Sequence, residues 1–398
     1  MTPAQRYHSL DNLRAIMMWL GIVLHVAVNH LVENDSPLPW RDTARSEFAD
    51  LTLVFIHVFR MPVFFILSGF FVAMLVSRRG YGGMLKHRLR RIGLPFIIFW
   101  PFLFLGMGVL AMLYVHLMVK GSLGIDPAIM PVHPDRPLIN TMHLWFIYYL
   151  LWFSACAALY GLVEKYVPQG FRDRLSALWL MLSSTWWGFI VLALPLAAIG
   201  ASYKWGVVTA SGSFIPQPDE FLHNGLFFVA GLHIYRHRQT LLERYSTCSW
   251  RYLAAGLGFF ILYLFFAELF RHGQDTMPAA RAWLAWIYNG TTWLWSFALI
   301  GLFVRYLPEQ NRFLKYISES SYWVYLVHML GTIGFGIMLY GMPFGAVTKM
   351  GINIVATTLA CLATYQLLVR HTPVGTLLNG RRIPSRGSAQ AGEGIPAA

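Results

Sequence analysis

Residues 92–119 read IGLPFIIFWPFLFLGMGVLAMLYVHLMV, a run that contains no Asp, Glu, Lys or Arg. A helix needs about 20 apolar residues to cross a bilayer core. Backbone polar groups inside hydrocarbon must also be satisfied within the segment itself, which favours a helix. The run therefore predicts a transmembrane helix.

Similar runs recur along nearly the whole chain. Of its 398 residues, 57% are hydrophobic and 12% are charged, whereas a soluble domain carries about 25% charged residues. The mean hydropathy is +0.51. We therefore predict an all-α fold, a polytopic membrane helix bundle with about ten transmembrane helices. The predicted spans cover residues 10–30, 51–76, 92–118, 141–163, 176–199, 219–235, 252–270, 282–304, 321–340 and 350–369.

The positive charge has two interpretations. A net charge of +13 is compatible with nucleic-acid binding, but in a membrane protein it indicates basic cytoplasmic loops. If the N-terminus is cytoplasmic, more than two thirds of the 31 Lys and Arg fall on that side of ten spans. We therefore expect both termini in the cytoplasm and no nucleic-acid partner.

The remaining organisation is simple. Residues 1–370 form the predicted transmembrane domain, and residues 371–398, rich in small and polar residues, form a cytoplasmic tail that we expect to be disordered. The three cysteines include no CxxC, so neither a disulfide framework nor a zinc site is predicted. We predict no metal site.

The first span carries polar groups on one stripe. His25 follows Arg14 by eleven residues, close to three helical turns, which is about 16 Å along the axis. Asp11 lies near the same stripe. In the expected topology Arg14 is at the cytoplasmic edge and His25 in the outer half. Alternatively, Arg14 is a snorkelling anchor and His25 is a structural histidine.

The second span contains His57 and Arg60, which share a face because they are three residues apart. Both are expected in the outer half of the membrane. Charged residues inside spans are costly and usually face the bundle interior. Arg60 is therefore expected to hold an anion or a carbonyl oxygen, unless it belongs to a structural ion pair.

A basic stretch precedes the third span and includes Arg88, Arg90 and Arg91. It is a signal for cytoplasmic location. Arginine side chains also bind phosphates well, so the stretch equally suits a phosphate-rich cytoplasmic ligand.

Other polar or aromatic residues stand in or near the spans. Each is a candidate for acceptor binding, although a single residue of this kind more often has a structural role. They are Asp11, His143, Trp145 and His328.

Five segments together resemble the acyltransferase family 3 membrane proteins, and in particular a glucan-modifying branch. The segments are LDNLRA at 10–15, RMPVFFILSGFF at 60–71, KHRLRRIGLP at 86–95, HLWFIYYL at 143–150 and SYWVYLVH at 321–328. The resemblance covers residues 1 to about 370. It implies an enzyme of the bacterial inner membrane that moves an acyl group from cytoplasmic acyl-CoA to a hydroxyl of a periplasmic glycan.

The resemblance also implies residue roles. His25 matches the essential histidine of the first span and Arg14 its arginine. Arg88, Arg90 and Arg91 lie in the basic motif linked to acyl-CoA, and His57 with Arg60 matches the HxxR of the glucan branch. The expected donor is acetyl-CoA or succinyl-CoA, with no bound cofactor, and the expected acceptor is an osmoregulated periplasmic glucan.

These roles agree with the chemistry of acyl transfer, which needs a base for the hydroxyl proton and a donor for the developing oxyanion. We expect His25 to be the base, His57 to orient it or share its proton, and Arg60 to hold the oxyanion or a succinyl carboxylate. Arg14 is expected to line the channel of the donor. The chain has no GxSxG, and Ser68 is interpreted as a packing residue.

Two other classes fit buried polar groups in a ten-span bundle. A transporter or exporter of a glycan or lipid would show inverted repeats, which the sequence lacks. A bis-histidine haem protein is the third class. Neither the oligomeric state nor the identity of the acyl group follows from the sequence.

Overall fold

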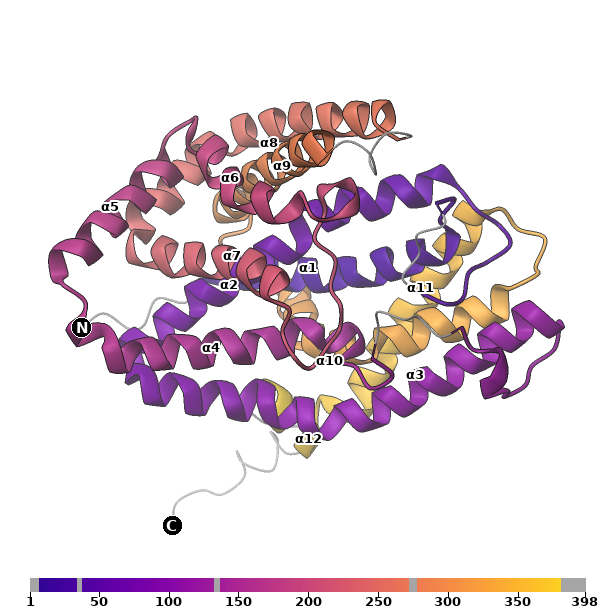
Figure 1. The fold of residues 1–398 in the computed structure, drawn as a ribbon. Coiled ribbons are helices and arrows are strands. Elements are labelled where there is room, and N and C mark those ends of the chain that lie inside the picture. Colours follow the sequence, from indigo (N-terminus) through magenta and orange to yellow (C-terminus); the bar gives the residue numbers. More distant parts are fainter. Residues whose placement is uncertain (1–6, 34–37, 132–136, 272–277, 381–398) are drawn as a thin grey trace, which may run out of the picture. The chain divides into compact units, whose positions relative to one another are not determined.

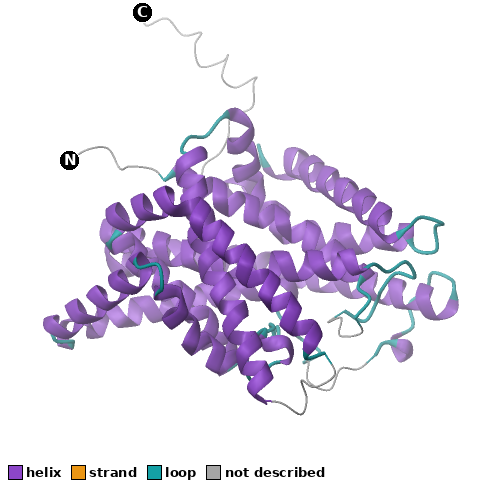
Figure 2. Cartoon of the chain, turned by 90° about the horizontal axis from the view of Figure 1, so that it is seen from above, coloured by secondary structure: helices purple, strands orange, loops and turns teal. Residues whose placement is uncertain are grey.

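The computed structural model describes residues 7–33, 38–131, 137–271 and 278–380. Within these residues every regular element is a helix, and no strand occurs (Figure 2). The predicted all-α class is confirmed, as expected for a chain whose apolar runs have to satisfy their own backbone groups.

The labelled helices follow one another in chain order (Figure 1). They are α1 (His8–Ala27), α2 (Glu47–Arg88), α3 (Leu94–Lys120), α4 (Trp145–Val163), α5 (Gln169–Ser184), α6 (Gly188–Gly200), α7 (Pro218–Arg236), α8 (Arg238–Leu269), α9 (Pro278–Tyr306), α10 (Arg312–Leu339), α11 (Ala346–Thr364) and α12 (Pro373–Asn379). Short helical turns extend several of them: η1 (Val28–His30), η2 (Leu89–Gly93), η4 (Met142–Leu144) and η7 (Tyr365–Val369).

The number of helices that are apolar enough to span a membrane is lower than the ten predicted spans, because helices and predicted spans do not correspond one to one. Among the described residues, seven helices are long and apolar enough to cross a membrane, or up to eight if the bent pair α5 and α6 is one span. One of the seven is the continuous segment Glu47–Lys120, with 74 residues. As one straight helix at about 1.5 Å per residue it would be about 111 Å long, far more than a bilayer core of about 30 Å. This segment therefore contains two of the predicted spans, and Gly80, with φ 67°, interrupts it between them.

The predicted single span 176–199 is instead two helices, α5 and α6, bent by 109°. The bend falls at Thr185–Trp187. A Cβ at Gly188 would lie 1.8 Å from the Leu182 carbonyl oxygen, so only glycine permits this turn. Hydropathy alone did not reveal the bend, because the apolar residues continue through it.

The predicted span 219–235 coincides with α7, which begins at Pro218. This helix is not among the seven apolar ones, because its first turns hold polar residues. Glu220 in the first turn is buried. Its carboxylate accepts hydrogen bonds from the Ser211 amide at 2.8 Å and the Tyr149 hydroxyl at 3.1 Å.

The chain forms two compact units. The first contains residues 1–17, 54–86 and 133–315, and the second residues 18–53, 87–132 and 316–398. In the first unit, α2 and α7 approach closely through two glycines. A Cβ at Gly69 would lie 1.9 Å from the Phe228 carbonyl oxygen, and one at Gly231 would lie 1.9 Å from that of Ile66. Small residues thus bring the two backbones together.

In the second unit, α10 is braced against α11. The Trp323 indole donates to the Thr364 hydroxyl at 3.0 Å, and the Asn353 amide donates to the Thr332 carbonyl at 3.0 Å. Such hydrogen bonds fix the rotation of one helix against the next in an environment without water. α10 therefore presents a defined face to its neighbours.

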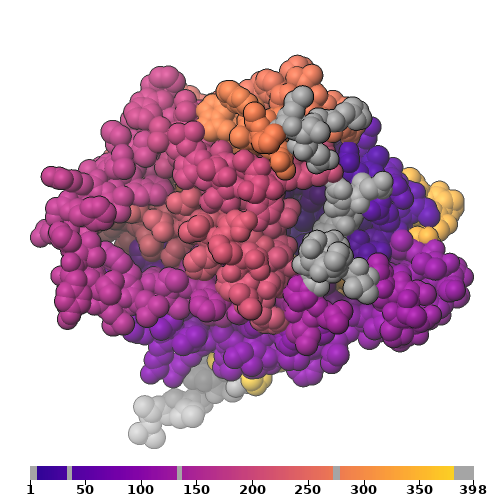
Figure 3. Space-filling view, viewed as in Figure 1, coloured from indigo at the N-terminus to yellow at the C-terminus, as the bar shows by residue number. Residues whose placement is uncertain are grey.

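Apolar side chains of the second unit also lie outside its core. On α3, Ile97, Phe102 and Leu105 are each about two thirds or more exposed, and Figure 3 shows this segment at the surface. Exposed large apolar residues in such numbers are typical of a surface that faces lipid or another protein.

The start of the predicted disordered tail, 371–398, is ordered. Pro373–Asn379 forms α12, with Pro373 in its first turn and Gly380 in a left-handed C-cap, the expected order for a short capped helix. The remainder, 381–398, lies outside the described residues.

Candidate active site

The polar stripe of the first span lies on one uninterrupted helix, because α1 runs from His8 to Ala27. The predicted spacing of Arg14 and His25 along that helix therefore holds. At its N-terminal end, Arg14 forms an ion pair with Asp11 at 3.1 Å, and its guanidinium lies 5.5 Å from the ring centre of Phe71. Asp11 is thus a partner of Arg14.

In the second unit, His25 of α1 lies next to His328 of α10. Their ring centroids are 5.2 Å apart, with an angle of 43° between the planes. His328 is 1% exposed, whereas His25 is partly exposed. Both histidines are candidate residues in the sequence, but the sequence does not predict that they are neighbours in space, because they lie 303 positions apart.

In the first unit, three helices bring a second polar cluster together. His57 of α2 makes a 2.8 Å hydrogen bond between its Nδ1 and the hydroxyl of Tyr288 on α9. It also lies within electrostatic reach of Arg60 and His223. Arg60 is 8% exposed. We name these residues with Asn289 the HxxR cluster.

His223 on α7 completes the HxxR cluster. Its Nε2 lies 3.2 Å from the side-chain oxygen of Asn289, whose own amide nitrogen donates to the Ala285 carbonyl. The Asn289 oxygen can only accept, so His223 donates from Nε2. Tyr288 and Asn289 were not predicted as site residues, because a lone Tyr-Asn pair in an apolar run carries no spacing signal.

His143 and Trp145 lie at the start of α4. His143 is 8% exposed and follows Met142, whose φ is 52°. Thr141 fixes this turn by donating to the Gly212 carbonyl from its amide and its hydroxyl. Trp145 packs against Phe65 with ring centroids 6.1 Å apart. Trp145 therefore belongs to an aromatic core of the first unit.

The basic motif of the second unit lies at the end of α2 and in the π-helical turn η2. Arg90 is exposed, whereas Arg88 and Arg91 are half-buried. Arg91 donates to the Leu377 carbonyl of α12 at 3.3 Å, and a Cβ at Gly380 would collide with its guanidinium. Arg91 thus has a structural contact that the sequence did not indicate.

A buried ion pair was missed by sequence reasoning. Lys349 of α11 lies 2.7 Å from Asp42, and both side chains are 1% exposed. Asp42 also accepts from the Ala44 amide at 2.8 Å, and the Ala44 carbonyl lies 2.8 Å from Nδ1 of His30. No local pattern could have predicted a pair formed by residues this far apart.

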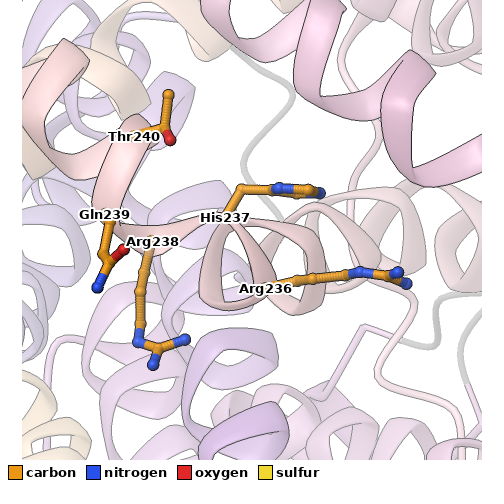
Figure 4. A pocket seen from close by; sticks show the side chains of 5 residues that line it. All are labelled: Arg236, His237, Arg238, Gln239 and Thr240. Atoms are coloured by element: carbon orange, nitrogen blue, oxygen red, sulfur yellow. The ribbon is translucent and has the colours of Figure 1, made fainter. Parts of the chain in front are cut away.

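A pocket with a cavity volume of about 280 Å³ lies at the turn between α7 and α8. Figure 4 shows the side chains of Arg236 and His237 extending in roughly the same direction, while Arg238 points elsewhere. The three already have partners: Arg236 pairs with Asp173, His237 bonds to Ser176, and Arg238 donates to a carbonyl oxygen. Burial, and then the charge of Arg236, lowers the pKa of His237. None of the predicted site residues lines this pocket.

Metal binding has no obvious place among residues 7–33, 38–131, 137–271 and 278–380. In these residues no three His, Cys, Asp or Glu side chains come together as a metal site would require. The predicted absence of a metal stays a prediction.

Comparison with known proteins adds the family. The model of the acyltransferase domain matches residues 7–366. The chain belongs to this acyltransferase family. Several helices apolar enough to span a membrane make this acyltransferase a multi-pass membrane protein.

Similar curated proteins include three from Escherichia coli strains. Glucans biosynthesis protein C of Escherichia coli O17:K52:H18 (strain UMN026 / ExPEC), of O157:H7 and of strain K12 / DH10B are each 27% identical to the chain over 345 residues, which is 84% of the chain and 84% of each relative. No solved structure matches. Membership of the acyltransferase family favours an enzyme over the transporter and haem alternatives.

Proposed function

We propose that this membrane acyltransferase moves an acetyl or succinyl group from cytoplasmic acyl-CoA to a hydroxyl of a periplasmic glycan. An osmoregulated periplasmic glucan is the proposed acceptor, because the similar proteins bear the name glucans biosynthesis protein C. The proposed location is the bacterial inner membrane. Acyl-CoA is the donor substrate in this proposal, and no resident cofactor is required.

The partly exposed imidazole of His25 carries the proposal. A histidine inside a predicted span is expensive to place there and marks a functional site. His25 stands on α1 about three turns from the Arg14–Asp11 pair, and the His328 ring lies next to it. A base that the substrate can reach, held inside an acyltransferase domain, suits activation of a hydroxyl.

In the proposed reaction His25 takes the proton of the acceptor hydroxyl. The hydroxyl oxygen forms an ester bond to the acyl carbon, and the carbon–sulfur bond of the thioester breaks. The departing CoA thiolate then receives the proton from His25. The reaction returns His25 to its starting protonation state. All atoms are accounted for without a covalent acyl-enzyme.

The donor is proposed to bind through the basic motif of the second unit. The exposed Arg90 and the half-buried Arg88 suit phosphate groups, because guanidinium groups bind phosphate with two donors. Arg91 contributes less directly, since it also donates to the Leu377 carbonyl. Arg14 at the end of α1 is proposed to line the donor channel.

The HxxR cluster suits an anionic or oxyanionic group. Arg60 is 8% exposed, and a buried guanidinium interacts strongly with a nearby negative charge. His57 and His223 provide further hydrogen-bonding nitrogens. We propose that Arg60 holds the developing oxyanion or, for a succinyl group, the free carboxylate.

Acyl transfer in proteoliposomes tests the function. Purified protein is supplied with labelled acyl-CoA and glucan, and label in the glucan is measured for the wild type and His25→Ala. General-base catalysis typically contributes about 10² to 10⁴ in rate, so we expect a loss of at least about 100-fold. His116→Ala makes the same change on α3 and should keep activity. Wild-type rates in His25→Ala would rule out the proposed base.

The acyl group and acceptor need a separate measurement. Mass spectrometry of periplasmic glucans from a strain that lacks the gene should show the loss of a mass of about 42 Da for acetyl or 100 Da for succinyl per substituent. An unchanged glucan together with an altered surface polysaccharide would replace the proposed acceptor.

A further inference from the structure

His328 is the buried neighbour of His25 in the second unit. Its hydrogen bonds determine which ring nitrogen carries a hydrogen. Nδ1 lies 3.0 Å from the Val324 carbonyl oxygen and 2.9 Å from that of Tyr325. Carbonyl oxygens only accept hydrogen bonds, so Nδ1 carries a hydrogen whether the ring is neutral or charged. Nε2 is therefore the atom of this ring that accepts or releases a proton.

The two rings are arranged for coupling. Because Nδ1 turns back to the helix that carries it, the ring edge with Nε2 lies away from the α10 backbone. The His25 ring is adjacent, with centroids 5.2 Å apart. Two positive imidazoles at this separation repel each other strongly in a medium of low dielectric constant. The state of one ring thus influences the other.

The surroundings hold His328 in place. The ring is 1% exposed, Tyr325 lies against it with ring centroids 6.2 Å apart, and α11 braces α10 through Asn353 and Thr364. A residue whose own rotamer is fixed by packing and hydrogen bonds can orient a neighbouring catalytic group. His25, in contrast, is partly exposed and accessible to a substrate.

We propose that His328 is a positioning residue for His25: its buried ring packs against the His25 imidazole and thereby fixes the orientation in which that imidazole meets the substrate. The coupling of the two rings follows from the second unit alone, whereas its effect on catalysis rests on the proposed function. His328 does not exchange a proton with the substrate.

Two substitutions separate this role from a merely structural one. In His328→Asn, the side-chain amide can still donate to the carbonyls near Nδ1 but has no group at the Nε2 position. In His328→Gln, the amide reaches the Nε2 position. A structural role is preserved by Asn, whereas a positioning role is preserved better by Gln. His116→Asn on α3 is the matched control.

The first measurement is acyl transfer to glucan, with the melting temperature as a test of folding. His328→Asn should melt like the wild type, lose about 10- to 100-fold in kcat, and keep its KM for acyl-CoA, because residues that orient a neighbouring reactive group commonly have effects of this size. His328→Gln should retain more activity than His328→Asn. Wild-type kcat in a correctly folded His328→Asn would overturn the proposal.

The second measurement does not depend on activity. Diethylpyrocarbonate modifies neutral imidazoles, and mass spectrometry follows its reaction with His25 in the full-length protein at pH 7. His328→Asn should change the rate at His25 at least about threefold, whereas His116→Asn should leave it unchanged. An unchanged rate in His328→Asn would exclude the coupling.

Together the two measurements distinguish a failure of the proposed function from a failure of the positioning role. If the wild type transfers no acyl group but labelling of His25 depends on His328, the proposed function is wrong and the coupling stands. If the wild type is active and neither kcat nor labelling responds to His328→Asn, the positioning role is wrong and the function stands.

Discussion

The Lys349–Asp42 pair shows what one contact contributes at the residue scale. The two side chains are 307 positions apart in sequence, 2.7 Å apart in space, and both 1% exposed. Two buried charges stabilise the fold only as a pair, because each has lost its hydration. The pair joins the loop before α2 to the first turn of α11 within the second unit.

Removing one partner should destabilise the protein. Lys349→Met leaves a buried carboxylate without its counter-charge, so we expect a loss of about 3–5 kcal/mol. Asp42→Asn combined with Lys349→Met should recover most of it. Unfolding in detergent, followed by the denaturant midpoint, measures both. Glu268→Gln, which removes the exposed Arg271 pair, should change stability by at most about 1 kcal/mol.

If Lys349→Met and Glu268→Gln lower the free energy of unfolding by the same small amount, the counter-charge of Lys349 is not needed to stabilise the buried Asp42. A double variant that is less stable than Lys349→Met would likewise contradict the expectation.

At the element scale, glycines set the distance between α2 and α7. Gly69→Ala places a methyl group 1.9 Å from the Phe228 carbonyl oxygen, so the helices must separate. Overpacking of this kind costs about 1–3 kcal/mol or more. The melting temperature should fall clearly for Gly69→Ala.

Gly108→Ala is the matched control, because nothing lies within 4 Å of a Cβ at Gly108. Alanine favours the helix by about 1 kcal/mol over glycine, so this variant should be as stable as the wild type or slightly more stable. Equal melting temperatures for the two variants would mean that the close approach of α2 and α7 is not required.

The arginines of the basic motif differ in their exposure and in their contacts, so their substitutions should have different effects. Arg90 is exposed on η2, whereas Arg91 donates to the end of α12. We expect Arg90→Ala to weaken acyl-CoA binding several-fold at low salt without changing the melting temperature. The difference from the wild type should shrink as salt rises, because phosphate contacts are screened.

Arg91→Ala should instead lower the melting temperature, since it removes a contact between η2 and α12. A hydrogen bond to a charged group contributes about 1.5–3 kcal/mol. Titration calorimetry with acyl-CoA and thermal unfolding separate the two effects. A stable Arg91→Ala variant that has lost all affinity would assign Arg91 to the donor site directly.

At the scale of the whole molecule, the charge distribution predicts the orientation in the membrane. The predicted topology places the loop after α3 outside and the turn between α7 and α8 in the cytoplasm. In a background without native cysteines, Ser122→Cys should react with an impermeant maleimide in intact spheroplasts. Thr240→Cys should react only after permeabilisation. Both positions are exposed, so burial does not decide the result, and the opposite pattern would invert the topology.

The sequence predicted much of the helical structure and the residue types of the site. The helix bounds of α7 and the continuity of α1 agree with the predicted spans, because hydropathy and helical periodicity are local properties. His25, His57 and Arg60 stood out because polar groups in apolar runs are rare. The bend between α5 and α6 was not predicted, because the apolar residues continue through it; there Gly188 lies against the Leu182 carbonyl at the end of α5.

The amino-acid sequence by itself determined that the chain is a helical membrane acyltransferase. The length of its apolar runs and the order of its motifs can be recognised without the tertiary structure. Only the tertiary structure decided that His328 lies beside His25, that His223 and Tyr288 accompany the HxxR pair, and that Asp42 neutralises Lys349. These pairs depend on how each helix is rotated and packed. Rotation and packing follow from the combined contacts of many distant residues, which no local pattern encodes.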